Sequence, residues 1–192
     1  MIKTLYPTFQ RWTEKGSLWI ISDTHFDDFD CKLMDENWIT PEEHLAIINK
    51  YVHKNDTLVH LGDVGDPTYM TKIKAYKILI TGNHDPGAEC FKDYFDEIYT
   101  GPLMIAEKIL LSHEPLDITW AFNIHGHDHN RQNKKDEFHL NCASNVVDYA
   151  PFNMKDIIKS GVLKNVKSIH RYTIDMATER KERRNENDAN EA

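Results

Sequence analysis

The sequence predicts an α/β protein in which two packed, mixed β-sheets are flanked by helices. Two observations carry this prediction. Helix and strand patterns alternate through the first half of the chain, and short strand patterns dominate from about residue 98 onward. Alternation followed by strand-rich sequence fits two sheets with helices on the outside. The 192 residues suffice for one domain with a substantial hydrophobic core.

Strands and helices alternate up to about residue 95. Residues 1–16 suit either a first strand or a covering arm. The expected strands of this half are residues 17–22, 57–61 and 76–80. Thr40 and Glu43 stand in the positions of a capping box, which predicts a helix to about His53, with His44 and His53 on its surface. Shorter helices are expected at residues 66–74 and 88–95.

Short strands dominate the second half. They are expected at residues 103–106, 108–112, 122–125 and 138–142. Asn153 then caps a helix over residues 154–160, and apolar spacing at residues 169–176 predicts a last amphipathic helix. Residues 179–192 are polar, mixed in charge and free of aromatic side chains, which predicts a disordered tail. We therefore expect a single domain over residues 1–178, followed by this tail.

The composition favours a reducing, aqueous compartment. Cys31, Cys90 and Cys142 are isolated, which disfavours both a disulfide framework and a thiolate zinc site. Each is expected to be a small buried hydrophobe. No apolar run approaches membrane-spanning length, and the net charge of −8 argues against strong nucleic-acid binding. We therefore expect a cytoplasmic protein without a membrane partner, and we leave a homodimer open.

Five expected strands end in Asp, Asn or His side chains, and these residues form the candidate site. They are Asp23, His25, Asp63, Asn83, His113, His127 and His129. Strand ends suit chemistry because the strand is rigid and the following loop is exposed. Each block alone is typical of a polar turn, whereas five together indicate a cluster. Carboxylate, amide and imidazole ligands suit Mn²⁺, Fe²⁺, Zn²⁺, Ni²⁺ or Co²⁺, and we expect manganese first among them.

The order of these blocks resembles the calcineurin-like metallophosphoesterase superfamily, whose pattern is D-x-H, GD-x-x-D, GNH-D/E, a lone His and GH-x-H. The matching residues are Asp23 with His25, residues 62–66, residues 82–85, His113 and residues 126–129. The pattern spans residues 17–130 with no ligand replaced. The chain is more similar to the small, single-domain bacterial and phage members. The resemblance implies the α/β-β-α sandwich of the metallophosphoesterase fold, with metals at the carboxyl ends of the strands.

The resemblance also implies a role for each residue of the cluster. One divalent ion is held by Asp23, His25, Asp63 and His129, and a second by Asp63, Asn83, His113 and His127. Asp63 then bridges the two ions. His84 is implied as a proton donor to the leaving oxygen, or as a stabiliser of phosphoryl charge. Asp66 is implied to orient His84, although it also suits the N-cap position before Pro67.

The implied function is hydrolysis of phosphodiester or phosphomonoester bonds, with nucleotides among the candidate substrates, by hydroxide that two metal ions activate. The partner is then a small phosphoester. A metal-dependent nuclease is an alternative that the acidic charge disfavours. A non-catalytic scaffold on the same fold is a second alternative, disfavoured because His84 and every ligand are present. A basic patch at residues 130–135 either guides a phosphate or is a solvated turn.

Overall fold

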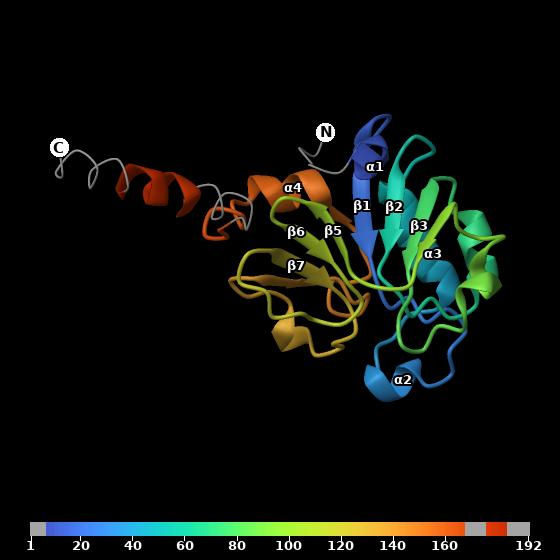
Figure 1. The fold of residues 1–192 in the computed structure, drawn as a ribbon. Helices are drawn as coiled ribbons and strands as arrows, with labels where there is room; N and C mark the ends of the chain where they lie inside the picture. The colour runs from blue at the N-terminus through green and yellow to red at the C-terminus, as the bar shows by residue number, and fades with distance from the viewer. Residues whose placement is uncertain (1–6, 168–175, 184–192) are drawn as a thin grey trace, which may run out of the picture.

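A computed structural model describes residues 7–167 and 176–183, and in it two β-sheets lie between outer helices (Figure 1). In spatial order, the first sheet consists of β4 (Glu97–Tyr99), β3 (Tyr76–Ile80), β2 (Thr57–His60), β1 (Leu18–Ile21) and β9 (Phe152–Asn153). The second consists of β5 (Leu103–Ala106), β6 (Ile109–Leu111), β7 (Phe122–His125) and β8 (His139–Asn141). Both sheets mix parallel and antiparallel pairs, which confirms the predicted fold class.

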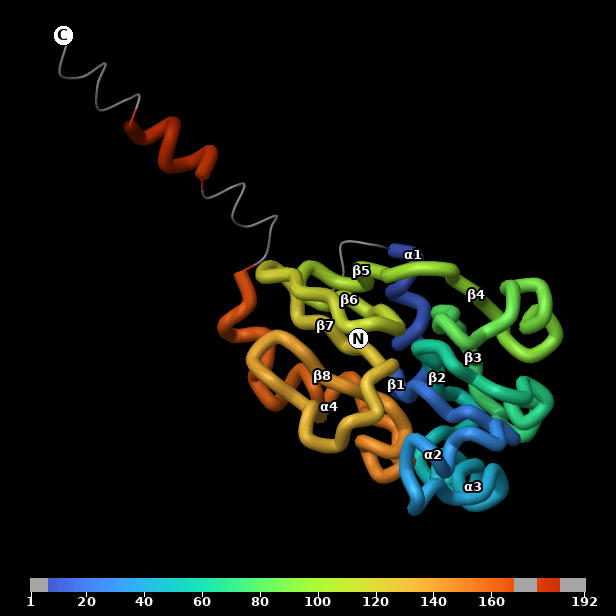
Figure 2. Tube along the Cα trace, turned by 90° about the horizontal axis from the view of Figure 1, so that it is seen from below, coloured from blue at the N-terminus to red at the C-terminus, as the bar shows by residue number. Residues whose placement is uncertain are grey.

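The parallel strands bring their carboxyl ends to one edge of the molecule. β1, β2, β3 and β4 pair in parallel in the first sheet, and β6, β7 and β8 do so in the second. The sheets are joined at this edge because Ser22 N–H donates to Cys142 O at 3.0 Å and Ser144 N–H donates to Ser22 O at 3.0 Å. Figure 2 looks onto this edge, with α2 (Cys31–Met34) and α3 (Pro41–Tyr51) on one side of β1 and β8 on the other.

Two apolar clusters stabilise this arrangement. The cluster between the sheets joins residues such as Ile20 and Val59 of the first sheet to Phe122 and Ile124 of the second. The other cluster packs α3 and its neighbours against the outer face of the first sheet, with Ile48 fully buried there. Each such side chain contributes about 1.5–3 kcal/mol of transfer free energy on burial. The strand ends are therefore held on a rigid scaffold.

The remaining helices are short. They are α1 (Pro7–Gln10), η1 (Arg11–Thr13), η2 (Pro67–Lys72), η3 (Ala88–Phe91), η4 (Arg131–Asn133) and α4 (Met154–Lys159). The described part of the N-terminal segment, residues 7–13, is helical and not a strand, and Trp12 is buried there. The helices expected at residues 66–74 and 88–95 are single 3₁₀ segments, because so few residues cannot repay the cost of nucleating an α-helix. Asn153 caps α4 as predicted.

Helix α3 confirms the predicted capping box, since Thr40 accepts Glu43 N–H and the Glu43 side chain accepts Thr40 N–H.

Two expectations for single residues, His44 and Cys90, are wrong. His44 is 1% exposed, because Phe26 and Tyr149 cover its side of the helix. Cys90 is exposed, because η3 turns its side chain outward.

Only part of the predicted C-terminal structure falls on residues that the structure describes. Residues 168–175, which hold most of the expected last helix, lie outside the described residues, whereas residues 176–183 are helical. The domain boundary at residue 178 and the disorder of the tail stay predictions. In the part of the chain that the structure describes, every helix is too short or too polar to cross a membrane.

Candidate metal centre

The seven predicted ligands lie in loops that follow strands of both sheets. Four of them adopt the left-handed backbone region, with φ of 54° at Asp23, 42° at His25, 56° at Asp63 and 68° at His127. Non-glycine residues rarely adopt this conformation, and it concentrates at functional sites. The sharp turns direct the side chains toward one another at the joined edge of the sheets.

Asp23, His25 and His129 form what we call the first ligand group, with one ligand atom from each within 4.8 Å of the others. His25 Nδ1 lies 2.9 Å from Asp28 Oδ2, so this nitrogen donates and Nε2 is left as a lone-pair ligand. His129 Nδ1 lies 3.0 Å from Asn145 Oδ1, and its Nε2 is 3.6 Å from Asp23 Oδ1. Such outer hydrogen bonds fix the ring and tautomer of metal-binding histidines.

The second ligand group consists of Asp63, Asn83, His113 and His127. Ligand atoms of its carboxylate and two imidazoles lie within 4.8 Å of one another. His113 Nδ1 donates to Leu61 O at 2.8 Å, which leaves Nε2 free to ligate. Asn83 Oδ1 lies 2.7 Å from His113 Nε2 and 3.0 Å from His127 Nδ1. The amide oxygen and both imidazoles therefore converge on one point.

Asp63 stands between the two groups. Its Oδ2 is 3.7 Å from His25 Nε2 in the first group and 3.4 Å from His113 Nε2 in the second. Its Oδ1 accepts His84 N–H at 2.9 Å. Burial alone would raise the pKa of Asp63, but the hydrogen bond and charge of His113, with the other donors, lower it to about 2. One ionised carboxylate is thus shared by both groups.

The residues present fit divalent metal ions. His25 Nε2 is buried and has no hydrogen-bond partner, and a buried polar atom without a partner is unfavourable unless a ligand completes it. The donors are oxygen and imidazole nitrogen, which suit hard and borderline ions. Burial raises the pKa of the neighbouring Cys31 thiol to about 12, and this thiol donates to His25 O at 3.5 Å.

Two glycines and Asp85 hold the loops in place. A Cβ on Gly82 would overlap the Asp63 carboxylate, and one on Gly126 would overlap that of Asp23, so no side chain fits at either glycine. Asp85 accepts three backbone N–H groups, from Asp63 and Val64 at 2.9 Å and from Gly82 at 2.8 Å. It therefore connects the loop after β2 to the loop after β3 through hydrogen bonds.

The structure brings His84 to the centre but does not join Asp66 to it. The His84 ring is exposed, and its centroid lies 5.9 Å from that of His25. The Asp66 side chain accepts Thr68 N–H as the N-cap of η2. Within residues 7–167, no hydrogen bond or ion pair links Asp66 with His84. An orienting role for Asp66 stays a prediction.

Sequence reasoning missed the residues that surround the ligands. Asp28 and Asn145 hold His25 and His129, yet neither belongs to a recognisable block. Arg131, expected in a basic patch, is engaged in ion pairs with Asp35 at 3.0 Å and Asp148 at 2.9 Å. It thereby links the loop of residues 26–40 to the segment that carries Asn145. The available signals were the spacing of three between His25 and Asp28 and the local excess of acids.

The chain is similar to proteins of known structure and to a known family. A protein of unknown function, AQ665 from Aquifex aeolicus, has a similar structure, with a TM-score of 0.63 and 28% identity over 74% of this chain and 98% of that one. The Pseudomonas putida nuclease MPE matches with a TM-score of 0.43 and 21% identity over 57% of this chain and 60% of the nuclease. No curated protein matches significantly. The model of the calcineurin-like phosphoesterase family matches residues 16–161, and the chain belongs to that family.

Proposed function

We propose that this chain is a dinuclear metal-dependent hydrolase of phosphodiester or phosphomonoester bonds. The observation that carries the proposal is the position of Asp63 Oδ2, which lies within 3.7 Å of a histidine nitrogen from each ligand group. A carboxylate in this position can offer oxygen to two ions at once. Hydrolysis of phosphoesters agrees with the family of the chain. The carboxylate, amide and imidazole donors support two divalent metal ions as the cofactors.

Two divalent ions would supply a water of lowered pKa and positive charge beside the phosphoryl oxygens. The protein's own part is to hold the ligands and to manage the proton of the leaving group. His84 is exposed beside the centre while its N–H anchors Asp63, so its ring is available to protonate a leaving oxygen. Asp66 remains our candidate for orienting that ring.

The donor set and the cysteines support the finer details of the proposal. Manganese is our first candidate among Mn, Fe, Zn, Ni and Co, because carboxylate and amide oxygens share the site with imidazoles. The three free cysteines support a reducing cytoplasm. The substrate is a small phosphoester, with nucleotides among the candidates, and a homodimer stays open.

A nuclease and a non-catalytic scaffold remain the alternatives. The net charge of −8 disfavours a long polyanionic substrate. A scaffold does not need the buried, unpartnered His25 Nε2 or the fixed tautomers of His25 and His113. We therefore place the phosphoesterase first.

A substrate panel tests the proposal. The protein, loaded in turn with Mn²⁺, Fe²⁺, Zn²⁺, Ni²⁺ and Co²⁺, is assayed on bis-p-nitrophenyl phosphate, p-nitrophenyl phosphate, cyclic nucleotides and single-stranded DNA. Asp63→Ala is the matched control, because it should abolish any activity of this centre. Hydrolysis of a small ester that disappears in the control supports the proposal. Cleavage of DNA alone would establish the nuclease, and no hydrolysis with any metal would favour the scaffold.

A further inference from the structure

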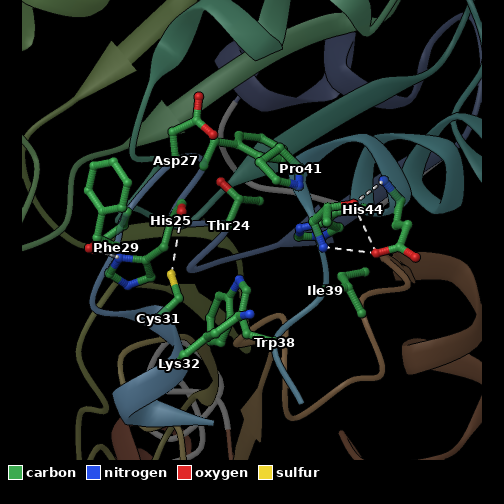
Figure 3. Close-up of a pocket in the computed structure, with 14 residues that line it drawn as sticks. Thr24, His25, Asp27, Phe29, Cys31, Lys32, Trp38, Ile39, Pro41 and His44 are labelled. Atoms are coloured by element: carbon green, nitrogen blue, oxygen red, sulfur yellow. Dashed lines mark hydrogen bonds and ion pairs between the residues drawn. The ribbon is translucent and has the colours of Figure 1, made fainter. Parts of the chain in front are cut away.

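A cavity of about 420 Å³ lies beside the metal centre, between the loop of residues 26–40 and the first turn of α3 (Figure 3). We call it the α3 cavity. The ligand His25 forms part of its wall, so a substrate held at the centre can extend into it. Apolar and aromatic side chains, including Phe26, Trp38 and Ile39, form much of the remaining wall. This size and lining are typical of small-molecule sites.

His44 supplies a polar atom without a partner. This residue lines the α3 cavity and is 1% exposed, yet its Nε2 has no hydrogen-bond partner. Burial lowers the pKa of His44 to about 3, so the ring is neutral and has one N–H and one lone pair. No cluster of metal-ligating side chains among the described residues includes His44. A hydrogen-bonding group of an organic ligand therefore suits His44 Nε2 better than a metal ion does.

Phe29 supplies an aromatic face that stacks on no other ring among the described residues. It is 97% exposed and also lines the α3 cavity. Figure 3 shows Phe29 and His25 on one side of the cavity and His44 on the other, with Thr24 and Trp38 between them. A flat ring that lies in the cavity can therefore face Phe29 at one end and present its edge to His44 at the other. Bases commonly stack on exposed aromatic side chains of this kind.

The charge around the α3 cavity limits the ligand further. Asp27, Asp28 and Glu43 line it against a single lysine, Lys32. The carboxylates already accept hydrogen bonds, from Tyr69 Oη, His25 Nδ1 and Thr40 N–H. Such a wall repels a second phosphate. The occupant should therefore be flat, neutral and able to hydrogen-bond at its edge.

We propose that the α3 cavity binds the nucleobase of a small nucleoside phosphoester whose phosphate lies at the metal centre. The face of the base lies on Phe29, and its edge hydrogen-bonds His44 Nε2. The inference rests on the proposed function, since it names the substrate class of the same centre. An oligonucleotide is disfavoured because its further phosphates would meet the carboxylates.

Competition between matched ligands tests the proposal. The Mn²⁺-loaded enzyme hydrolyses bis-p-nitrophenyl phosphate in the presence of AMP, CMP, GMP, UMP or ribose 5-phosphate. These inhibitors share a phosphate on a sugar and differ in the base. At least one nucleotide should inhibit about tenfold more strongly than ribose 5-phosphate, the effect expected of one stacked base. Equal inhibition by all five would overturn the proposal.

Two variants locate the effect, each with a matched control. Phe29→Ala should remove the tenfold preference and leave inhibition by ribose 5-phosphate unchanged. Leu33→Ala, which truncates a side chain that is 85% exposed on the same loop but outside the cavity, should change neither. His44→Phe should weaken inhibition by the nucleotide alone, whereas His53→Phe, at an exposed position just beyond the C-terminal end of α3, should not. If His44→Phe fails to fold by circular dichroism, Phe29→Ala still decides, because Phe29 is almost fully exposed.

A binding measurement separates failure of this proposal from failure of the proposed function. Calorimetric titration of the metal-free protein with adenosine, cytidine, guanosine and uridine needs no catalysis. Binding of at least one nucleoside, lost in Phe29→Ala, supports the α3 cavity even if no ester is hydrolysed. Hydrolysis of bis-p-nitrophenyl phosphate without nucleoside binding or nucleotide preference would leave the phosphoesterase standing and overturn the nucleobase site.

Discussion

The two ligand groups of the metal centre differ in how the protein holds their histidines. In the first group, His25 is 4% exposed and His129 has a side chain that is 18% exposed, and Asp28 and Asn145 fix their rings. In the second group, His113 is fixed in the same way, but His127 is exposed. The neighbours of the His127 Nδ1 atom are Asn83 and His113, which are themselves predicted ligands.

The first group is therefore already arranged to receive an ion, whereas the second group still contains an exposed histidine. Fixed ligands lose little conformational freedom when they coordinate a metal, whereas exposed ligands must be ordered at that step. We therefore expect the first group to bind its ion more tightly and the second to exchange its ion more readily.

Removing one histidine from each group should separate the two ions. His25→Ala should lose the tightly bound ion and keep the weaker one, because only the first group is damaged. His127→Ala should lose the weaker ion and keep the tight one. Calorimetric titration with Mn²⁺ measures both affinities in each variant. Loss of the tight ion in His127→Ala would reverse the contrast.

His84 should belong to neither group. His84→Ala should keep both ions and the fold, while turnover falls by about 10²–10⁴-fold, the range typical of a lost acid–base group. The loss should be steeper for esters with poor leaving groups, since p-nitrophenolate leaves with little protonation. Kinetics on paired esters and metal analysis of the same sample check this. Wild-type rates on both esters would remove His84 from the mechanism, and a lost ion would make it a ligand.

The residues that hydrogen-bond the histidines of the first group should affect the metal affinity of that group alone. Asp28→Ala and Asn145→Ala should each weaken the tight ion by about 10–100-fold, the usual effect of losing such a supporting hydrogen bond, and leave the weaker ion unchanged. Asp27→Ala is the matched control, because that neighbouring carboxylate accepts the Tyr69 hydroxyl and, among the described residues, has no hydrogen bond or ion pair with a predicted ligand. Equal weakening of both ions would show that the groups are not held separately.

Asp66 should have the smallest effect. Asp66→Asn retains an N-cap for η2, since Asn and Asp cap equally well, so thermal stability should not change. If Asp66 orients His84, turnover should fall by less than in His84→Ala, again more for poor leaving groups. Unchanged turnover would limit Asp66 to the cap seen in the structure.

The sequence predicts the fold and the convergence of ligands well because both follow from local patterns. Alternating strands and helices place carboxyl ends at one edge, and residues such as Asp23, His25 and Asp63 follow those ends directly. The capping box at Thr40 and Glu43 is likewise local and was confirmed.

The supporting residues could not be predicted because they act across the fold. Asn145 reaches His129 over 16 positions, and Asp85 accepts N–H groups 21 and 22 positions away. His44 was expected on the surface because its helix pattern alone does not reveal the loops that cover it. These contacts depend on how the loops after the strands fold together, which no spacing of residues encodes.

The central claim is that Asp63 joins the two groups into one dinuclear centre. Native mass spectrometry of Mn²⁺-loaded protein tests it most directly, with wild type, Asp23→Ala and Asp63→Ala measured side by side. We predict two ions per chain in wild type, one in Asp23→Ala and none retained in Asp63→Ala. A wild type that saturates at one ion, or an Asp63→Ala variant that loses one ion as Asp23→Ala does, would contradict the account.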